Sequence, residues 1–133
     1  MRAASDASLE QNKGLVRRWV DEAVNQGRLE ALDELYPPEK VAHAKAWIEP
    51  FRASFPDVHM EIVELIAEGD RVVGRFVCSG THKGPWRGHE PTGRRFEGVD
   101  EVYIFRLRAG RIVDAWGVED TLDRFRQLGL PAR

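Results

Sequence analysis

The sequence contains only one cysteine, Cys78. A single cysteine excludes an internal disulfide and the cysteine cluster of a structural zinc site. The histidines also lack the paired spacing of zinc-binding motifs; they are His43, His59, His82 and His89. We therefore expect no metal site. We interpret Cys78 as a buried, unreactive thiol, because the sequence places no base beside it.

An excess of positive charge is also missing. The 20 Lys and Arg residues are balanced by 22 Asp and Glu, for a formal net charge of −2, so the chain has no basic surface for a phosphate backbone. No apolar run approaches the roughly 18–20 residues that span a bilayer, and the segment MRAASDASLEQNKG lacks the apolar core of a signal peptide. We expect neither a nucleic-acid nor a membrane partner, and a cytoplasmic location.

The remaining composition is typical of a globular protein. Hydrophobic residues make up 42% and charged residues 32% of the 133 residues, a mixture that supports one buried core. This length has room for one domain, which we expect to span 1–133. Residues 1–7 are small and polar, and we expect them to form a disordered end.

Helical periodicity dominates the first half of the chain. Ser8 begins a capping-box pattern, and apolar residues follow it at helical spacing as far as Gly27, which can end the helix. A short helix over 28–36 and a third helix over about 39–54 are also predicted. Pro50 lies inside the third helix and is expected to kink it.

Strand-like alternation dominates the second half. Two pairs of strands are predicted, each pair joined by a turn; they cover 58–67, 71–79, 94–108 and 111–116. A final helix is predicted over 119–128. Hairpin-linked strands form an antiparallel meander, so the fold class is α+β. A strongly curved sheet wrapped over helices is a cone, and its open mouth is the expected ligand site.

Four short motifs occur in order along this half: FPD at 55–57, GDRVV at 69–73, PTGRR at 91–95 and GRIVDAW at 110–116. Together with the helical first half, they resemble the SnoaL-like polyketide cyclase and ester cyclase branch of the NTF2-like superfamily. The resemblance implies N-terminal helices packed on a curved antiparallel sheet, a short C-terminal helix, a largely apolar cavity and a homodimer through the outer sheet face. Family members close polyketide rings by intramolecular aldol chemistry, isomerise steroids, open epoxides or only bind ligands, so the reaction stays open.

The chain departs from this family at positions that matter for catalysis. Family cyclases use a histidine in the long strand and an aspartate after the last strand's tryptophan, and these positions fall on Tyr103 and Gly117. Gly117 and Ala115 are small, so we expect them to leave space in the cavity. The segment between Tyr36 and Phe51 is also shorter than in the relatives. These departures favour a module that has lost the His/Asp pair.

Three residues remain candidates for catalysis. Glu101 and Tyr103 share one face of the long strand, which the family register turns toward the cavity. Burial would raise the pKa of Glu101 and suit it to abstract a proton next to a carbonyl, while Tyr103 would donate to the enolate oxygen. Asp120 precedes the final helix and is the third candidate. The structural alternatives are an ion pair with an arginine such as Arg75 for Glu101, a packed ring for Tyr103 and a helix cap for Asp120.

Five further residues are candidates for contact with a substrate: Arg75 and Phe105 on the strands, Trp116 on the last strand, and His82 and Trp86 in the loop over 80–93. That loop is rich in glycine and proline, and it is expected either to act as a lid or to be a simple connection. Trp116 has packing in the sheet or at a dimer interface as its alternative role.

Two functions follow. The first is a cofactor-independent cyclase or isomerase that acts on a small hydrophobic, polyketide-like carbonyl compound. The second is a non-catalytic module that binds a hydrophobic ligand. Epoxide hydrolysis in related folds uses an Arg-x-Asp arrangement, which is absent here because Phe76 and Val77 follow Arg75.

Overall fold

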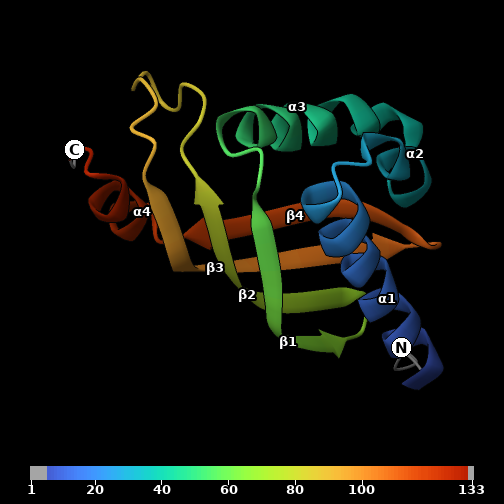
Figure 1. Ribbon diagram of the computed structural model, residues 1–133. Coiled ribbons are helices and arrows are strands. Elements are labelled where there is room, and N and C mark those ends of the chain that lie inside the picture. Colours follow the sequence, from blue (N-terminus) through green and yellow to red (C-terminus); the bar gives the residue numbers. More distant parts are fainter. Residues whose placement is uncertain (1–5, 132–133) are drawn as a thin grey trace.

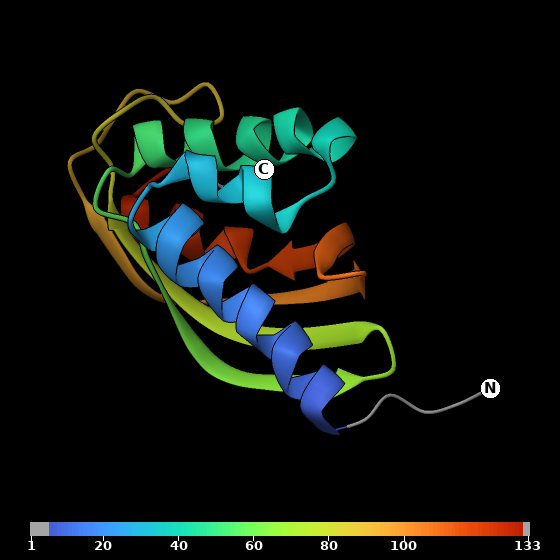
Figure 2. The same cartoon turned by 90° about the vertical axis from the view of Figure 1, so that its right-hand side faces the viewer.

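The computed structural model describes residues 6–131. The chain forms two layers, in which helices cover one face of a four-stranded antiparallel sheet with the strand order β1-β2-β3-β4 (Figure 1). Figure 2 shows the strands curving beneath the helices. The expected α+β cone with a short C-terminal helix is therefore confirmed.

The helical layer consists of α1 (Asp6–Arg18), the π-helical segment η1 (Trp19–Asn25), the 3₁₀ turn η2 (Leu29–Ala31), α2 (Leu32–Leu35) and α3 (Pro38–Ser54). Gly27 follows η1 with a φ of 71°, the left-handed conformation that glycine adopts without strain. The expected disordered end is wrong for residues 6 and 7, which are helical, and its other residues lie outside the described part of the chain. Ser8 accordingly lies within α1 and not at its start.

The sheet consists of β1 (His59–Glu68), β2 (Arg71–Thr81), β3 (Arg95–Arg108) and β4 (Arg111–Glu119), and α4 (Thr121–Leu128) follows it. The last strand therefore runs three residues beyond its predicted end at Trp116. This extension matters for the site, because it brings Glu119 opposite Glu101 in the β3–β4 register.

The two faces of the sheet have different roles. Odd-numbered side chains of β3 point toward the helices, as expected; Val99, Glu101, Tyr103 and Phe105 are all buried. Residues that pair directly across an antiparallel sheet lie on the same face. Gly117 pairs with Tyr103 and so lies on this inner face, whereas Arg75 pairs with Val102 and Trp116 with Ile104 on the outer face.

The core lies between the helices and the inner face of the sheet. Its fully buried apolar side chains come from every layer and include Val16, Val20, Leu32, Leu35, Phe55, Phe76, Phe96, Phe105, Ile112 and Leu128. Burial of this apolar surface is the main favourable term in folding.

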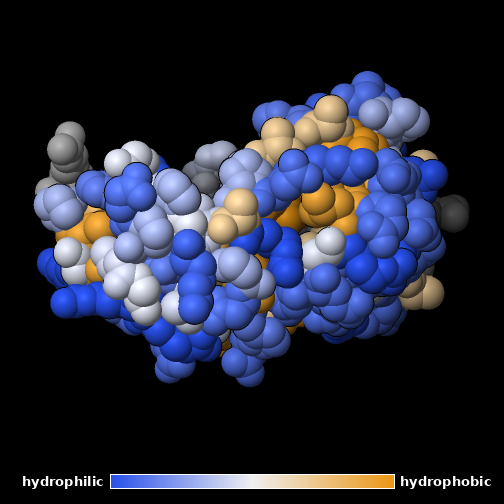
Figure 3. All heavy atoms as spheres, turned by 45° about the horizontal axis from the view of Figure 1, so that its top comes forward, coloured by the Kyte–Doolittle hydropathy of each residue, from blue (hydrophilic) through white to orange (hydrophobic). Residues whose placement is uncertain are grey.

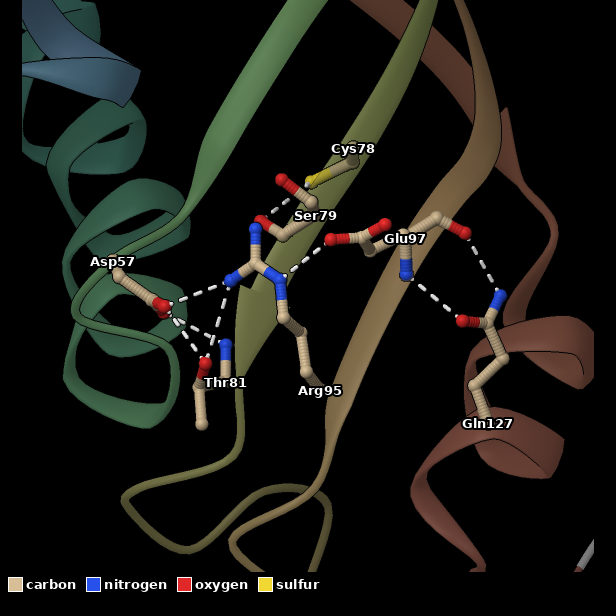
Figure 4. Close-up of polar contacts among 7 residues, drawn as sticks. All are labelled: Asp57, Cys78, Ser79, Thr81, Arg95, Glu97 and Gln127. Carbon is tan, nitrogen blue, oxygen red and sulfur yellow. Dashed lines mark hydrogen bonds and ion pairs between the residues drawn. The ribbon is translucent and has the colours of Figure 1, made fainter.

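A polar cluster fixes the base of the loop between β2 and β3 (Figure 4). The carboxylate of Asp57 accepts hydrogen bonds from the main-chain N–H and the hydroxyl of Thr81, each at 2.7 Å, and from Arg95 at 3.0 Å. Farther along β3, Gln127 of α4 bonds both main-chain groups of Glu97, at 2.8 and 2.9 Å. The loop and α4 are thereby both anchored to the end of the sheet.

Candidate active site

A pocket of about 310 Å³ opens between the helical layer and the inner face of the sheet. Figure 3 shows hydrophobic atoms at the bottom of a hollow on this side of the molecule, with hydrophilic atoms around its edge. Most lining side chains are aromatic or aliphatic: Trp19, Val24, Trp47, Ile48, Phe51, Val58, Met60, Trp86 and Val118. The polar ones are Arg52, Cys78, Arg87, Glu101, Tyr103 and Glu119. Such a wall, with a few polar groups, is typical of a small-molecule site.

Glu101 lies in this wall with 3% of its surface exposed. Its Oε1 accepts a hydrogen bond of 2.6 Å from the Tyr103 hydroxyl, and its Oε2 accepts one of 2.7 Å from Nη2 of Arg124. Burial raises the pKa of Glu101, although the Arg124 charge opposes that rise. The carboxyl group is thus buried, oriented through both of its oxygens and adjacent to the pocket.

Arg124 of α4 lies behind the pocket wall and is completely buried. Its Nη1 donates to Glu119 at 2.6 Å, so one guanidinium joins two carboxylates. Burial lowers the pKa of Arg124, but the charges of Glu119 and Glu101 outweigh it and the net shift is upward. The expected partner of Glu101 was an arginine such as Arg75, and the partner is instead Arg124, which the sequence analysis missed. The sequence pattern that could have identified Arg124 is its place beside Phe125 and Leu128 on the buried stripe of an amphipathic helix.

Tyr103 is held by aromatic neighbours on two sides. Its ring lies 5.9 Å from that of Trp19 and 5.5 Å from that of Trp47, both in edge-on geometry. Gly117 lies directly beneath the ring, and a Cβ built on that glycine would overlap it. Gly117 lines the pocket, and the Tyr103 ring occupies the space that its missing side chain leaves.

The other candidates for catalysis and binding lie away from the pocket, apart from Trp86. Asp120 is exposed, and its Oδ1 accepts the main-chain N–H of Asp123 at 3.0 Å as the N-cap of α4. Arg75 is exposed on the outer face and pairs with Asp100 at 3.1 Å. Asp120 therefore has its alternative role as a helix cap, and Arg75 forms an ion pair on the surface. Neither side chain lines the pocket.

The four remaining candidates for substrate contact also differ in position. Trp116 is 60% exposed on the outer face, and Phe105 is buried in the core beneath Trp19 at 5.2 Å between ring centroids. His82 is fully buried, and its Nδ1 accepts the main-chain N–H of Thr92 at 3.1 Å, which secures the loop without lining the pocket. Trp86 does line the pocket, from the loop that was expected to cover the mouth.

Residues 6–131 contain neither a candidate metal centre nor a candidate membrane-spanning helix. Within that range no group of three or more His, Cys, Asp or Glu side chains could hold a metal ion. None of the helices there is long and apolar enough to cross a membrane. Cys78 is buried in the pocket wall, as expected, and burial raises the pKa of its thiol.

The chain is similar to a known protein family and to several known proteins. Residues 14–128 match the family model described as SnoaL-like polyketide cyclase. Aklanonic acid methyl ester cyclase DnrD from Streptomyces peucetius is 36% identical over 110 residues, which cover 83% of this chain and 74% of that protein. The crystal structure of IdmH from Streptomyces antibioticus is 28% identical with a TM-score of 0.79, covering 90% of this chain and 99% of that one.

A SnoaL-like protein from Jannaschia sp. CCS1 is 22% identical and shares the fold, with a TM-score of 0.86 over 97% of this chain and 99% of that one. The family match covers all of the pocket-lining residues named above as well as Arg124. The chain belongs to the SnoaL-like polyketide cyclase family.

Proposed function

We propose that the protein is a cyclase that closes a ring in a small hydrophobic, polyketide-like carbonyl compound by acid–base chemistry in this pocket, without a cofactor. The observation that carries the proposal is the 2.6 Å hydrogen bond from the Tyr103 hydroxyl to Glu101 in the pocket wall. It places a base and an acid side by side in the pocket wall, and an intramolecular aldol reaction uses one group of each kind.

The proton has a complete path through these two residues. Glu101 removes a proton from the carbon next to one carbonyl group, and the resulting enolate carbon attacks a second carbonyl carbon of the same molecule to form the ring bond. The Tyr103 hydroxyl has one proton to donate, and protonation of Glu101 releases it to turn toward the new alkoxide. Glu101 then returns the substrate's proton to Tyr103, so both residues end in their starting states.

Arg124 and Glu119 support this path. Arg124 holds Oε2 of Glu101 and leaves Oε1 for the proton transfer. Glu119 binds the other side of the guanidinium, and its Oε2 lies 3.5 Å from the Tyr103 hydroxyl. Because Arg124 is anchored by two carboxylates, we assign it as a positioning residue for Glu101.

The loss of the usual His/Asp pair favoured a non-catalytic binding module in the sequence analysis. The carboxylate–tyrosine–arginine cluster supports the enzyme instead, because it offers an acid, Tyr103, at the position of the missing histidine and a base, Glu101, two residues before it on β3. The curated relative DnrD is named as a cyclase, which also favours an enzyme over a binding module.

The test is turnover by Glu101→Gln, with aklanonic acid methyl ester and the corresponding free acid as the two substrates offered. We expect turnover to fall by at least about 100-fold, as for loss of a general base, while the circular dichroism spectrum is retained. The matched control is Glu61→Gln, which changes an exposed carboxylate of β1. Unchanged turnover would remove Glu101 from the mechanism, and binding without turnover in the wild type would support the binding module.

We also propose that the protein forms a homodimer through the outer sheet face. Ile66, Val73, Ile104 and Trp116 are register partners in one row across all four strands. Charged pairs flank this row, Glu64 with Arg75 on one side and Arg106 with Asp114 on the other. A row of apolar residues flanked by oppositely charged residues can pack against the same row of a second copy related by a two-fold axis.

A further inference from the structure

Two arginines at the pocket lack an acidic partner. Arg52 and Arg87 both line the pocket, and no carboxylate of residues 6–131 lies within ion-pair distance of either one. The Arg52 guanidinium donates to main-chain carbonyls, including that of Asn25 at 3.1 Å. Arg87 is exposed and lies over the ring of Trp86, 5.2 Å from its centroid. Main-chain carbonyls thus bind the Arg52 guanidinium, whereas the exposed guanidinium of Arg87 has, within the described part of the chain, only the Trp86 ring beside it and remains available for an anion.

Arg87 also occupies an unusual backbone position. It and Gly88 are the central residues of a tight turn, closed by two hydrogen bonds of 2.9 Å between the main chains of Trp86 and His89. Both central residues have a positive φ, 49° for Arg87 and 79° for Gly88. Asn-Gly is the pair that such turns favour, because asparagine tolerates this conformation better than a long side chain does. A strained backbone of this kind gathers at binding sites.

The pocket wall carries charge of both signs, on buried and on exposed side chains. The buried wall carries Glu101 and Glu119 around the single guanidinium of Arg124. The exposed side carries Arg87, and the partly exposed Arg52 adds to it. An anionic group would be repelled by the carboxylates at the buried wall and attracted by the guanidinium groups at the opening. A planar carboxylate also matches the fork of guanidinium donors.

We propose that the pocket takes a substrate with a free carboxylate, which Arg87 binds at the opening while the reacting carbonyl lies beside Tyr103. The proposal rests on the proposed function for the carbonyl end and on the two arginines for the carboxylate. Recognition of a charged acid would set this chain apart from the relative DnrD, whose name gives a methyl ester.

The test compares two probes of the same shape, 2-naphthoate and 2-naphthamide, by isothermal titration calorimetry on the full chain. We expect the wild type to bind the acid about 5- to 10-fold more tightly than the amide, as for a charge-assisted contact at a partly exposed site. Arg87→Asn should reduce that preference to below about twofold, and Arg87→Lys should retain part of it. High salt should weaken the preference in the wild type.

The variant separates binding from folding. Arg87→Asn places the favoured Asn-Gly pair in the turn, so its melting temperature should equal or exceed that of the wild type. Arg126→Asn is the matched control, because it removes an exposed arginine of α4 that does not line the pocket. Equal binding of both probes to the wild type, or an undiminished preference in Arg87→Asn, overturns the carboxylate proposal alone. If neither probe binds the wild type, the proposed pocket for aromatic carbonyl compounds fails as well.

Discussion

At the scale of single residues, the site depends on a carboxyl group kept in a place where its charge is poorly solvated. Glu101 is 3% exposed and accepts hydrogen bonds from Tyr103 and Arg124. Removing one partner would leave a buried charge that is only partly compensated, which is costly in a protein interior. The three residues therefore act together, and a change at one is expected to alter the other two.

The stability of the protein should depend on pH through Glu101. Burial raises its pKa above the ordinary value of 4.5, so the folded state binds this proton more tightly than the unfolded state. The stabilisation is complete below the ordinary pKa and is lost as pH rises through the raised one. We expect the free energy of unfolding of the wild type to fall relative to that of Glu101→Gln as the pH rises above the ordinary pKa of 4.5, in urea titrations. A difference that stays constant with pH would contradict the raised pKa.

Gly117 should resist enlargement because of Tyr103. Gly117→Ala places a methyl group within the volume of the tyrosine ring, which Trp19 and Trp47 prevent from moving freely. We expect a loss of about 1–3 kcal/mol in the free energy of unfolding, as for overpacked cores. In a Tyr103→Ala background the same substitution should cost less than about 0.5 kcal/mol. Equal costs in both backgrounds would show that the ring is not the obstacle.

At the scale of elements, α4 links the end of the sheet to the site. Asp120 caps its first turn, Gln127 binds the main chain of β3, and Arg124 reaches Glu101 and Glu119. A helix of eight residues is marginal by itself, so it depends on its cap and on its packing. Loss of the cap would thus be transmitted to the carboxylates.

Asp120→Ala tests this dependence. It removes the acceptor for the N–H of Asp123, and we expect a loss of about 1 kcal/mol in the free energy of unfolding. Glu49→Ala is the control, because it removes an exposed carboxylate of α3 and should change stability by less than about 0.5 kcal/mol. If Asp120→Ala abolished turnover without loss of stability, Asp120 would return as a catalytic candidate.

At the scale of the whole molecule, the sheet separates two functions. The inner face builds the pocket, while the outer face exposes Ile66 at 57% and Trp116 at 60%. Exposed apolar side chains that form one continuous row indicate an interaction surface more strongly than isolated ones do. The proposed dimer would cover this row and leave the pocket open on the other side.

Ile66→Glu should yield a monomer in sedimentation velocity. In the dimer each new glutamate would be buried against the apolar row of the other copy, which is unfavourable for a charged group. Leu122→Glu is the matched control, since Leu122 is 46% exposed on α4 and lies outside the row. It should leave the dimer intact. A wild type that sediments as a monomer at all concentrations would contradict the proposed interface.

Much of the architecture could be predicted from local sequence patterns. The period of the apolar residues identified the long helices and the strands, and the alternation along 99–105 correctly turned Glu101 and Tyr103 inward. Such patterns are informative because each depends on neighbours within one or two turns or pleats. Element ends were less well predicted, since β4 extends to Glu119 only through its pairing with β3.

The partners of the site were decided by the tertiary structure alone. Glu101 and Arg124 are 23 residues apart in the sequence, and they meet only after β4 pairs with β3 and α4 folds back over the end of the sheet. The same packing explains Gly117, whose missing side chain makes room for a ring that comes from the neighbouring strand. The sequence thus determined which side chains of β3 face inward, because that depends on short-range periodicity. Which of them touch was decided by the fold, because those contacts depend on register and packing between distant segments.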